Sequence, residues 1–551
     1  MSRVDARRIA IVLLLFLVAV AAALARAPLE TGSVRLAGVS LVWWYAGVIA
    51  PLLAAALAVT ALVVAPPSQL PSPVVWSGPL LLLVVATRVL GGSADVAFLA
   101  VLVLVASLIV LLAAPERVPE TRLPRLLAVA TVAALVVTLG ANLRILVDVG
   151  AIVGLPQVVA LVIVVAGAGL LGLISPDAVR PGLLAAFGLT VVCAPVAVVA
   201  FTAGEAPWTA WRQIASRSAM TFAAGGTGVT EGVTVIVPTT LTFSETHRVT
   251  AAAPGVFRVS EQDGTPVTTR DWRLAAGESL TLRAGDRLSL PSGARVRFEA
   301  GKRVPGAVAS GITWADPPER RSPAALVHAV GLSVALMGGA LVLAVPLRPV
   351  SPAGAVVAVG WPVLWTIGAV CWGLYAAYAV PDIALGMPGA AGMVSLPERA
   401  LGGAQGHFLT TLAAAGLLFL ALAGAAAARR LTAACVGALG GQGRQGSARL
   451  AFVAVVGGGG VIAAIPFDAW QLLVLGFGFA AATVAAPLVA ARTGHGAAIG
   501  SLVGALIYLG MLAWGWHGHS GVTGPVLVAA PCAWAMARLL SPRPGRLRRT
   551  R

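Results

Sequence analysis

Three polar residues lie close together in one apolar part of the chain. Asn142 and Arg144 fall late in the apolar run 124–146, and Asp148 follows across a short turn. Ionisable groups at membrane depth usually serve ion or substrate pathways, because a charge in lipid is costly. These residues are therefore predicted as a polar membrane site. The alternative is that Arg144, near a helix end, extends its side chain to the interface.

A second candidate site combines Asp382, Glu398 and His407, which are expected at the outer membrane face. Carboxylates at that face could serve a transferase acting on a lipid-linked sugar. His328 is also expected toward the outer leaflet. Together with His407 it could supply a pair of axial haem ligands.

A tryptophan-rich motif, Trp514-Gly-Trp-His-Gly-His, contains His517 and His519. It resembles the tryptophan-rich outside loop near haem-ligating histidines in some cytochrome-assembly membrane proteins. The resemblance covers six residues, and the acidic positions of that family's motif are absent. The resemblance implies haem as a cofactor; apart from it, the sequence leaves open whether any cofactor binds. Two histidines at this spacing lack the further ligands of a zinc site, so no metal site is predicted.

Composition defines the class of protein. Hydrophobic residues make up 58% of the 551 and charged residues 11%, with a mean hydropathy of +0.93. Soluble chains carry about 25% charged residues, so a polytopic helical membrane protein is predicted. The four cysteines are widely spaced and are interpreted as packing residues.

Fourteen apolar stretches approach the roughly 20 residues needed to cross a bilayer. The first, which has arginines before it, also resembles a signal peptide, but a retained helix is preferred. The predicted segments are 9–25, 41–65, 73–91, 95–114, 124–146, 150–174, 182–203, 324–346, 353–378, 407–428, 450–466, 468–491, 496–515 and 522–540.

Arginine placement predicts the orientation. Eighteen arginines fall in short loops, helix ends and termini on one side of the predicted segments, against five on the other. Arginine-rich loops face the cytoplasm, so both termini are expected there, in a cytoplasmic membrane of bacterial inner-membrane type. This scattered placement also argues against a nucleic-acid surface, although the formal net charge is +17.

The stretch 204–323 interrupts the apolar pattern and holds 11 of the 21 acidic residues. Its start, around 208–214, fits a short interfacial helix. Period-two runs at 233–237, 256–259, 280–283, 287–290 and 295–299 predict a small extracytoplasmic β domain, a sandwich or a barrel. The expected organisation is a first membrane half at 1–203, this domain at 204–323, a second half at 324–541 and a basic tail at 542–551.

The β domain is the expected contact with large partners. It could dock a protein, or it could only shield the helices beneath it. Arg295, Arg297, Lys302 and Arg303 form a local basic run that could face anionic lipid or polymer; a solvated strand face is the alternative.

Glycine and proline placement describes helix packing. Gly496, Gly500 and Gly504 recur every four residues, which predicts close packing and burial of their helix. Seven helices on each side of the β domain would give two halves of opposed orientation, as in many secondary transporters, and prolines interrupt several segments. The leading prediction is a transporter or translocase of an envelope-related solute or lipid-linked species. The alternatives are a non-catalytic scaffold subunit and a membrane transferase.

Overall fold

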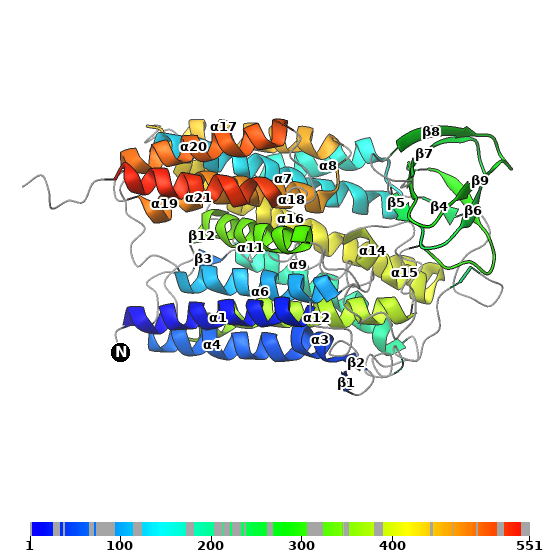
Figure 1. Cartoon of the computed structure of the whole chain (residues 1–551), viewed down its shortest axis with the longest axis horizontal. Helices are drawn as coiled ribbons and strands as arrows, with labels where there is room; N and C mark the ends of the chain where they lie inside the picture. The colour runs from blue at the N-terminus through cyan, green and yellow to red at the C-terminus, as the bar shows by residue number, and fades with distance from the viewer. Residues whose placement is uncertain are drawn as a thin grey trace, which may run out of the picture.

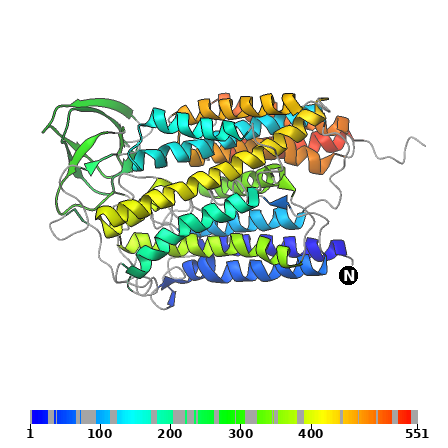
Figure 2. The ribbon, with the colours of Figure 1, turned by 180° about the vertical axis from the view of Figure 1, so that it is seen from behind.

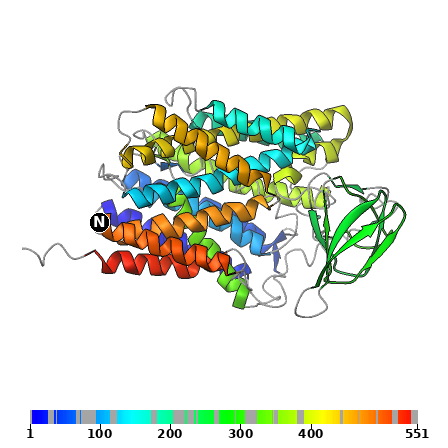
Figure 3. The same ribbon diagram turned by 90° about the horizontal axis from the view of Figure 1, so that it is seen from above.

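The protein is a bundle of long helices with a small β unit at one end (Figure 1). The computed structural model describes residues 3–25, 34–36, 39–65, 71–72, 94–113, 124–171, 181–202, 213, 221–222, 233–235, 239–261, 268–291, 293–305, 323–343, 345–346, 352–379, 390–440, 445–465, 467–491, 494–514 and 523–541. The first helix begins, and the last one ends, at the end of the bundle away from the β unit; Figure 3 shows the same separation from above.

Seven of the described helices are long and apolar enough to cross a membrane, and each falls on a predicted segment. A membrane location fits these helices. Two of the seven are continuous runs in which two α-helical parts flank a π-helical part. The seven are α1 (Arg3–Ala25), α3–η1–α4 (Leu41–Trp44, Tyr45–Ile49, Ala50–Val64), α7 (Arg125–Ile152), α16 (Gly403–Ala438), α17 (Gln445–Ala464), α18–η5–α19 (Ala469–Ala480, Ala481–Ala485, Ala486–Ala490) and α20 (Gly494–Ala513).

Six further helices contain shorter apolar stretches at predicted segments. They are α6 (Ala94–Ala113), α8 (Gln157–Leu170), α9 (Pro181–Thr202), α11 (Pro323–Leu343), α12 (Pro352–Ala379) and α21 (Gly524–Leu539). The predicted segment 73–91, most of the predicted interfacial helix at 208–214 and the tail 542–551 lie outside the described residues.

Helix α16 is longer than the predicted run 407–428. It has 36 residues, which corresponds to about 54 Å of helix and exceeds the thickness of a hydrocarbon core. Figure 2 shows it crossing the bundle obliquely. The predicted apolar run 407–428 lies inside this helix, and Arg429 and Arg430 follow the run directly. The helix continues through both to Ala438, since arginine is itself a good helix former and Leu431, Ala433 and Ala434 follow.

Helices from the two halves of the sequence interlock. Helix α12, from the second half, packs on α4 and α6, while α16 packs along α9 and also contacts α7. Helix α11 joins the two groups by packing on both α6 and α18. Each half therefore depends on the other for its packing.

Two of the membrane-length helices contain the same interruption. A five-residue π-helical part, η1 or η5, is followed by one alanine and then by Pro51 or Pro487. Proline lacks a backbone N–H, and its ring crowds the preceding turn, so widening that turn relieves the conflict. All five η5 residues, Ala481–Ala485, are buried. This interruption therefore lies inside the bundle.

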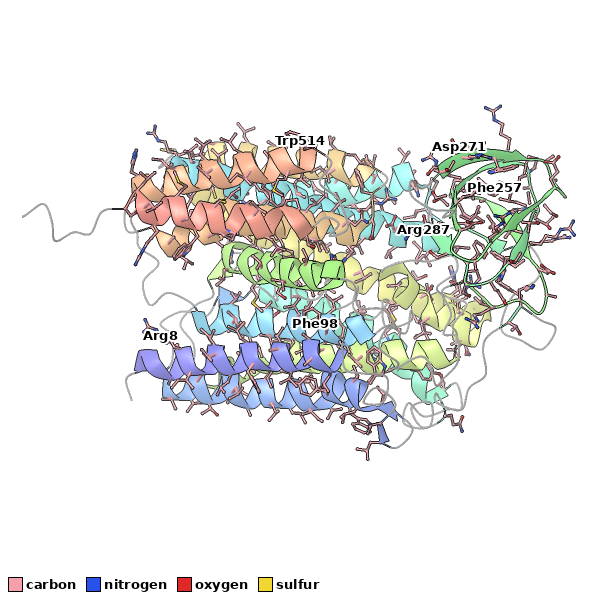
Figure 4. The ribbon with its side chains drawn as sticks, in the orientation of Figure 1. Arg8, Phe98, Phe257, Asp271, Arg287 and Trp514 are labelled. Atoms are coloured by element: carbon pink, nitrogen blue, oxygen red, sulfur yellow. The ribbon has the colours of Figure 1, made fainter. Side chains whose placement is uncertain are left out.

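The β unit, defined as the strands between Val233 and Phe298, contains two four-stranded sheets with antiparallel pairing. One buried cluster draws on strands of both sheets, and Figure 4 shows one of its members, Phe257, inside the unit. The sheet orders are β5-β10-β7-β8 and β4-β11-β6-β9. The strands are β4 (Val233–Thr234), β5 (Thr239–Thr242), β6 (His247–Ala251), β7 (Gly255–Glu261), β8 (Thr268–Leu274), β9 (Ser279–Leu282), β10 (Arg287–Leu290) and β11 (Arg295–Phe298).

The strands predicted from alternation are present at β4, β7, β9, β10 and β11. Buried and exposed side chains alternate along β11, as the sequence pattern predicts. Consecutive strands β9 and β10 belong to different sheets, so the tight turn at 284–286 crosses between the sheets. Strands β5, β6 and β8 have no counterpart among the predicted runs.

Candidate functional site

The structure brings Arg144 and Asp148 together near the end of α7. Arg144 Nη2 lies 3.1 Å from Asp148 Oδ1, one helical turn away. Arg144 is buried inside the bundle at 6% exposure. Asn142 is also fully buried, but two residues correspond to about 200° of helix rotation, so it occupies another face of α7.

A neighbouring helix end completes the environment of Arg144. Its Nη1 donates to the carbonyl oxygen of Ala463 at 3.3 Å, in the last turn of α17. Carbonyls there have no partner within their own helix and carry partial negative charge. Asp468, which accepts a bond from the Trp470 N–H at the start of α18, lies close enough for its charge to affect Asp148. The arrangement is a charged cap that joins the ends of α7 and α17, with the like-charged Asp468 nearby at the start of α18.

Two other buried arginines make the same kind of contact. Arg7 Nε donates to the carbonyl oxygen of Ala65 at 2.7 Å, just after α4, and Arg429 Nη1 donates to Leu171 at 2.7 Å, just after α8. Arg7 is 8% exposed and Arg429 is 7% exposed. Sequence reasoning counted both only as loop arginines that set the orientation. Their contacts show that they also cap helices far away in the sequence.

Of the three residues predicted to form the outer-face site, the structure describes two, Glu398 and His407. His407 Nδ1 lies 3.6 Å from Glu398 Oε1, and both side chains are exposed. The turn through Gly402 and Gly403, both with positive φ, folds α15 (Leu396–Leu401) back against the start of α16. The Glu398 N–H donates to Thr410 Oγ1 at 3.1 Å and fixes this turn. Asp382 lies outside the described residues.

The predicted histidine ligands have separate surroundings. His328 Nδ1 lies 2.9 Å from the hydroxyl of Thr523, at the start of α21, whereas His407 lies beside Glu398. His517 and His519 fall outside the described residues; Trp514, which opens their motif, is 90% exposed at the end of α20 (Figure 4). Within the described ranges there is no group of three or more His, Cys, Asp or Glu side chains placed to hold a metal.

The basic run on the β unit divides into two parts. Arg295 and Arg297 are exposed on the outer face of β11, whereas Lys302 and Arg303 are partly buried in the segment that follows. The Arg303 backbone N–H donates to Glu245 Oε1 at 2.6 Å, next to the β5–β6 turn. The run therefore combines two exposed arginines with two partly buried basic residues.

Acid should loosen the segment around Arg303. The hydrogen bond from the Arg303 N–H holds the pKa of Glu245 below its ordinary value. Its stabilisation is therefore complete above the unfolded pKa of about 4 and is lost as pH falls through the lower folded value. We expect hydrogen exchange of residues 299–305, corrected for intrinsic rate, to accelerate below about pH 4. Glu245→Gln should remove this pH dependence and Glu299→Gln should not; identical pH profiles in all three proteins would contradict the assignment.

The described candidate residues support structure more directly than catalysis. The buried ions cap helix ends, and the exposed pair of Glu398 and His407 stands at a turn between helices. Comparisons with protein-family models, with curated proteins and with solved structures find no match to this chain.

Proposed function

We propose that this chain is a multi-pass transporter or translocase of an envelope-related solute or lipid-linked species. In this proposal 14 helices cross the bacterial cytoplasmic membrane, with both termini in the cytoplasm. Residues 204–323 form an extracytoplasmic sandwich-type domain that docks a partner or gates the path. The placement of the termini and the β unit at opposite ends of the bundle supports this topology.

The observation that carries the proposal is the repeated interruption of membrane-length helices by a π-helical part and a proline. Interrupted helices let a bundle bend at defined points, and transporters use such points around their substrate sites. The interruption at η5 is enclosed by α11, α20 and α21. A bend there would move α19 and α21 relative to α7 and α16.

Pulsed electron paramagnetic resonance in liposomes would test this motion. Spin labels at Leu439→Cys and Leu539→Cys, with the four native cysteines replaced, report the separation of the ends of α16 and α21. Both sites are exposed, at 40% and 76%. We expect two distance populations whose ratio shifts when envelope lipid extract is added. Pro487→Ala should reduce them to one, because residue 487 regains its N–H.

Pro531→Ala is the matched control, since this proline lies inside α21, a helix with no assigned π-helical part. The control should keep both populations. One narrow distance distribution in every condition, together with no flux of lipid or solute in the same liposomes, would exclude a transporter.

A non-catalytic scaffold subunit is the second candidate. The observation that favours it is the open edge of the β unit at β8, which offers a partner protein a place to bind.

A further inference from the structure

Strand β8 is an unusually accessible sheet edge. It is the last strand of its sheet and pairs with β7 over seven consecutive residues without a bulge or proline. The other edges are much shorter: β5 and β9 have four residues each and β4 has two. Proteins usually protect edges by shortening, bending or covering them. Six of the seven β8 residues are exposed and the seventh is partly exposed, so no described part of the chain covers it.

The side chains of β8 provide two distinct faces. On the outer face Asp271 is paired with Arg258 at 2.8 Å, and Arg273 stands beside the exposed Val256. The other face of β8 is on the same side of the sheet as the buried core. There Trp272 lies opposite the buried Phe257 but is 38% exposed. Arg270 is exposed on that same face. Figure 4 shows Asp271 at the outer boundary of the unit.

The charges along β8 are unbalanced. Asp271 has its partner in Arg258, whereas Arg270 and Arg273 have no ion pair among the described residues. The surface has an open backbone edge, a tryptophan that is 38% exposed and two arginines with no ion pair in the described part of the chain. An extended acidic chain would complement it. Main-chain bonds would supply affinity, and the arginines and tryptophan would select side chains.

A second copy of this chain fits the edge poorly. Two copies inserted the same way in one membrane are related by an axis along the bundle, while antiparallel pairing of two β8 strands needs an axis perpendicular to β8. Figure 1 shows β8 running largely along the bundle. The second copy would therefore be inverted. Parallel pairing of two β8 strands about a two-fold axis along the strands would place N–H opposite N–H and C=O opposite C=O. Like groups of this kind cannot form hydrogen bonds with each other.

We propose that β8 binds an extended segment of a partner protein by antiparallel strand addition. The sheet is antiparallel throughout, so the added strand continues its pattern. Read from its N-terminus, the segment places an acidic residue opposite Arg273, an apolar residue opposite Trp272, any residue opposite Asp271 and an acidic residue opposite Arg270. The recognition pattern is acidic, apolar, any, acidic.

The test measures, by fluorescence anisotropy, how tightly a labelled peptide binds the full chain in lipid nanodiscs. The peptide is Thr-Val-Glu-Val-Thr-Glu-Val-Thr. The first control peptide has lysine for both glutamates, and the second has Pro-Pro for the central Val-Thr, which removes the N–H groups that strand addition requires. Wild type should bind only the acidic peptide. Arg270→Glu with Arg273→Glu should weaken this binding about tenfold and reverse the preference toward the lysine peptide, which also shows that the variant is folded.

Arg295→Glu with Arg297→Glu is the matched control, because both residues are exposed on β11 of the other sheet. This variant should bind the acidic peptide like wild type. Equal binding of all three peptides, no binding of any, or equal loss in the β11 variant would overturn the proposal. So would self-association of the wild type that the β8 variant abolishes. Because no transport is measured, the result is independent of the proposed function.

Discussion

Replacing Arg144 by methionine should lower the free energy of unfolding by about 3–5 kcal/mol, because it leaves Asp148 as a buried, uncompensated charge. The Asp148 side chain is only 16% exposed. The same change leaves the Ala463 carbonyl without the donor that now caps α17. Unfolding of the full chain in mixed micelles, titrated with denaturing detergent, would measure the loss.

Changing Asp148 separates the cost of breaking the ion pair from the cost of losing the arginine that caps α17. Asp148→Asn keeps the size of the side chain and the bond from Arg144 to Ala463 but leaves Arg144 as the buried, uncompensated charge, so its cost should fall in the same range, about 3–5 kcal/mol. The double variant should cost less than the sum of the two single changes, because each single change already breaks the same pair.

An exposed arginine provides the control for this experiment. Arg8→Met, at the outward-facing position shown in Figure 4, should change stability by no more than about 0.5 kcal/mol. Its buried neighbour Arg7, bonded to Ala65, should show a clear loss when changed to methionine. If Arg144→Met and Arg8→Met behave alike, the arginines do not act as helix caps.

Adding one methyl group at Gly500 should cost about 3 kcal/mol, near the upper end for overpacking. A Cβ there would lie 2.7 Å from the carbonyl oxygen of Ala533 and 2.7 Å from Cβ of Ala537, on α21. A backbone oxygen cannot rotate away, so α20 and α21 must separate. Detergent-induced unfolding of Gly500→Ala would measure the cost.

Gly510 gives the comparison on the same helix. A Cβ added there meets nothing within 4 Å, so Gly510→Ala should stabilise the helix by up to about 1 kcal/mol through its higher helix propensity. The free energy of unfolding should fall in Gly500→Ala and rise in Gly510→Ala. Equal effects would show that α20 does not pack on α21 through its glycines.

This contrast also corrects the expectation that the whole glycine-repeat helix is buried. Gly496, Gly500 and Gly504 do lie against α21 and η5, as their spacing predicted. However, only 33% of the apolar part of α20 is buried, and Leu506 is 65% exposed. Small residues mark one contact face of a helix, and they do not show whether the other faces have protein neighbours.

Strand prediction succeeded and failed for related reasons. Strand β11 alternates apolar and basic residues because its sheet has one buried face and one exposed face. Strand β8, Thr-Thr-Arg-Asp-Trp-Arg-Leu, shows no such alternation, because it lies at a sheet edge with both faces largely exposed. A strand that buries little has no hydrophobic pattern to detect, although its accessibility makes it the best candidate for binding a partner.

The apolar helical character, the approximate positions of the helices and the presence of a strand-rich interruption can all be read from the amino-acid sequence. These properties depend on local composition and periodicity, which are present in the chain before it folds. The roles of the charged residues depend on how the helices pack. An arginine at position 144 or 429 carries no local sign of whether it faces water, lipid or a carbonyl. Only packing brings Ala463 to Arg144 and Leu171 to Arg429 across hundreds of residues, and so makes these arginines helix caps.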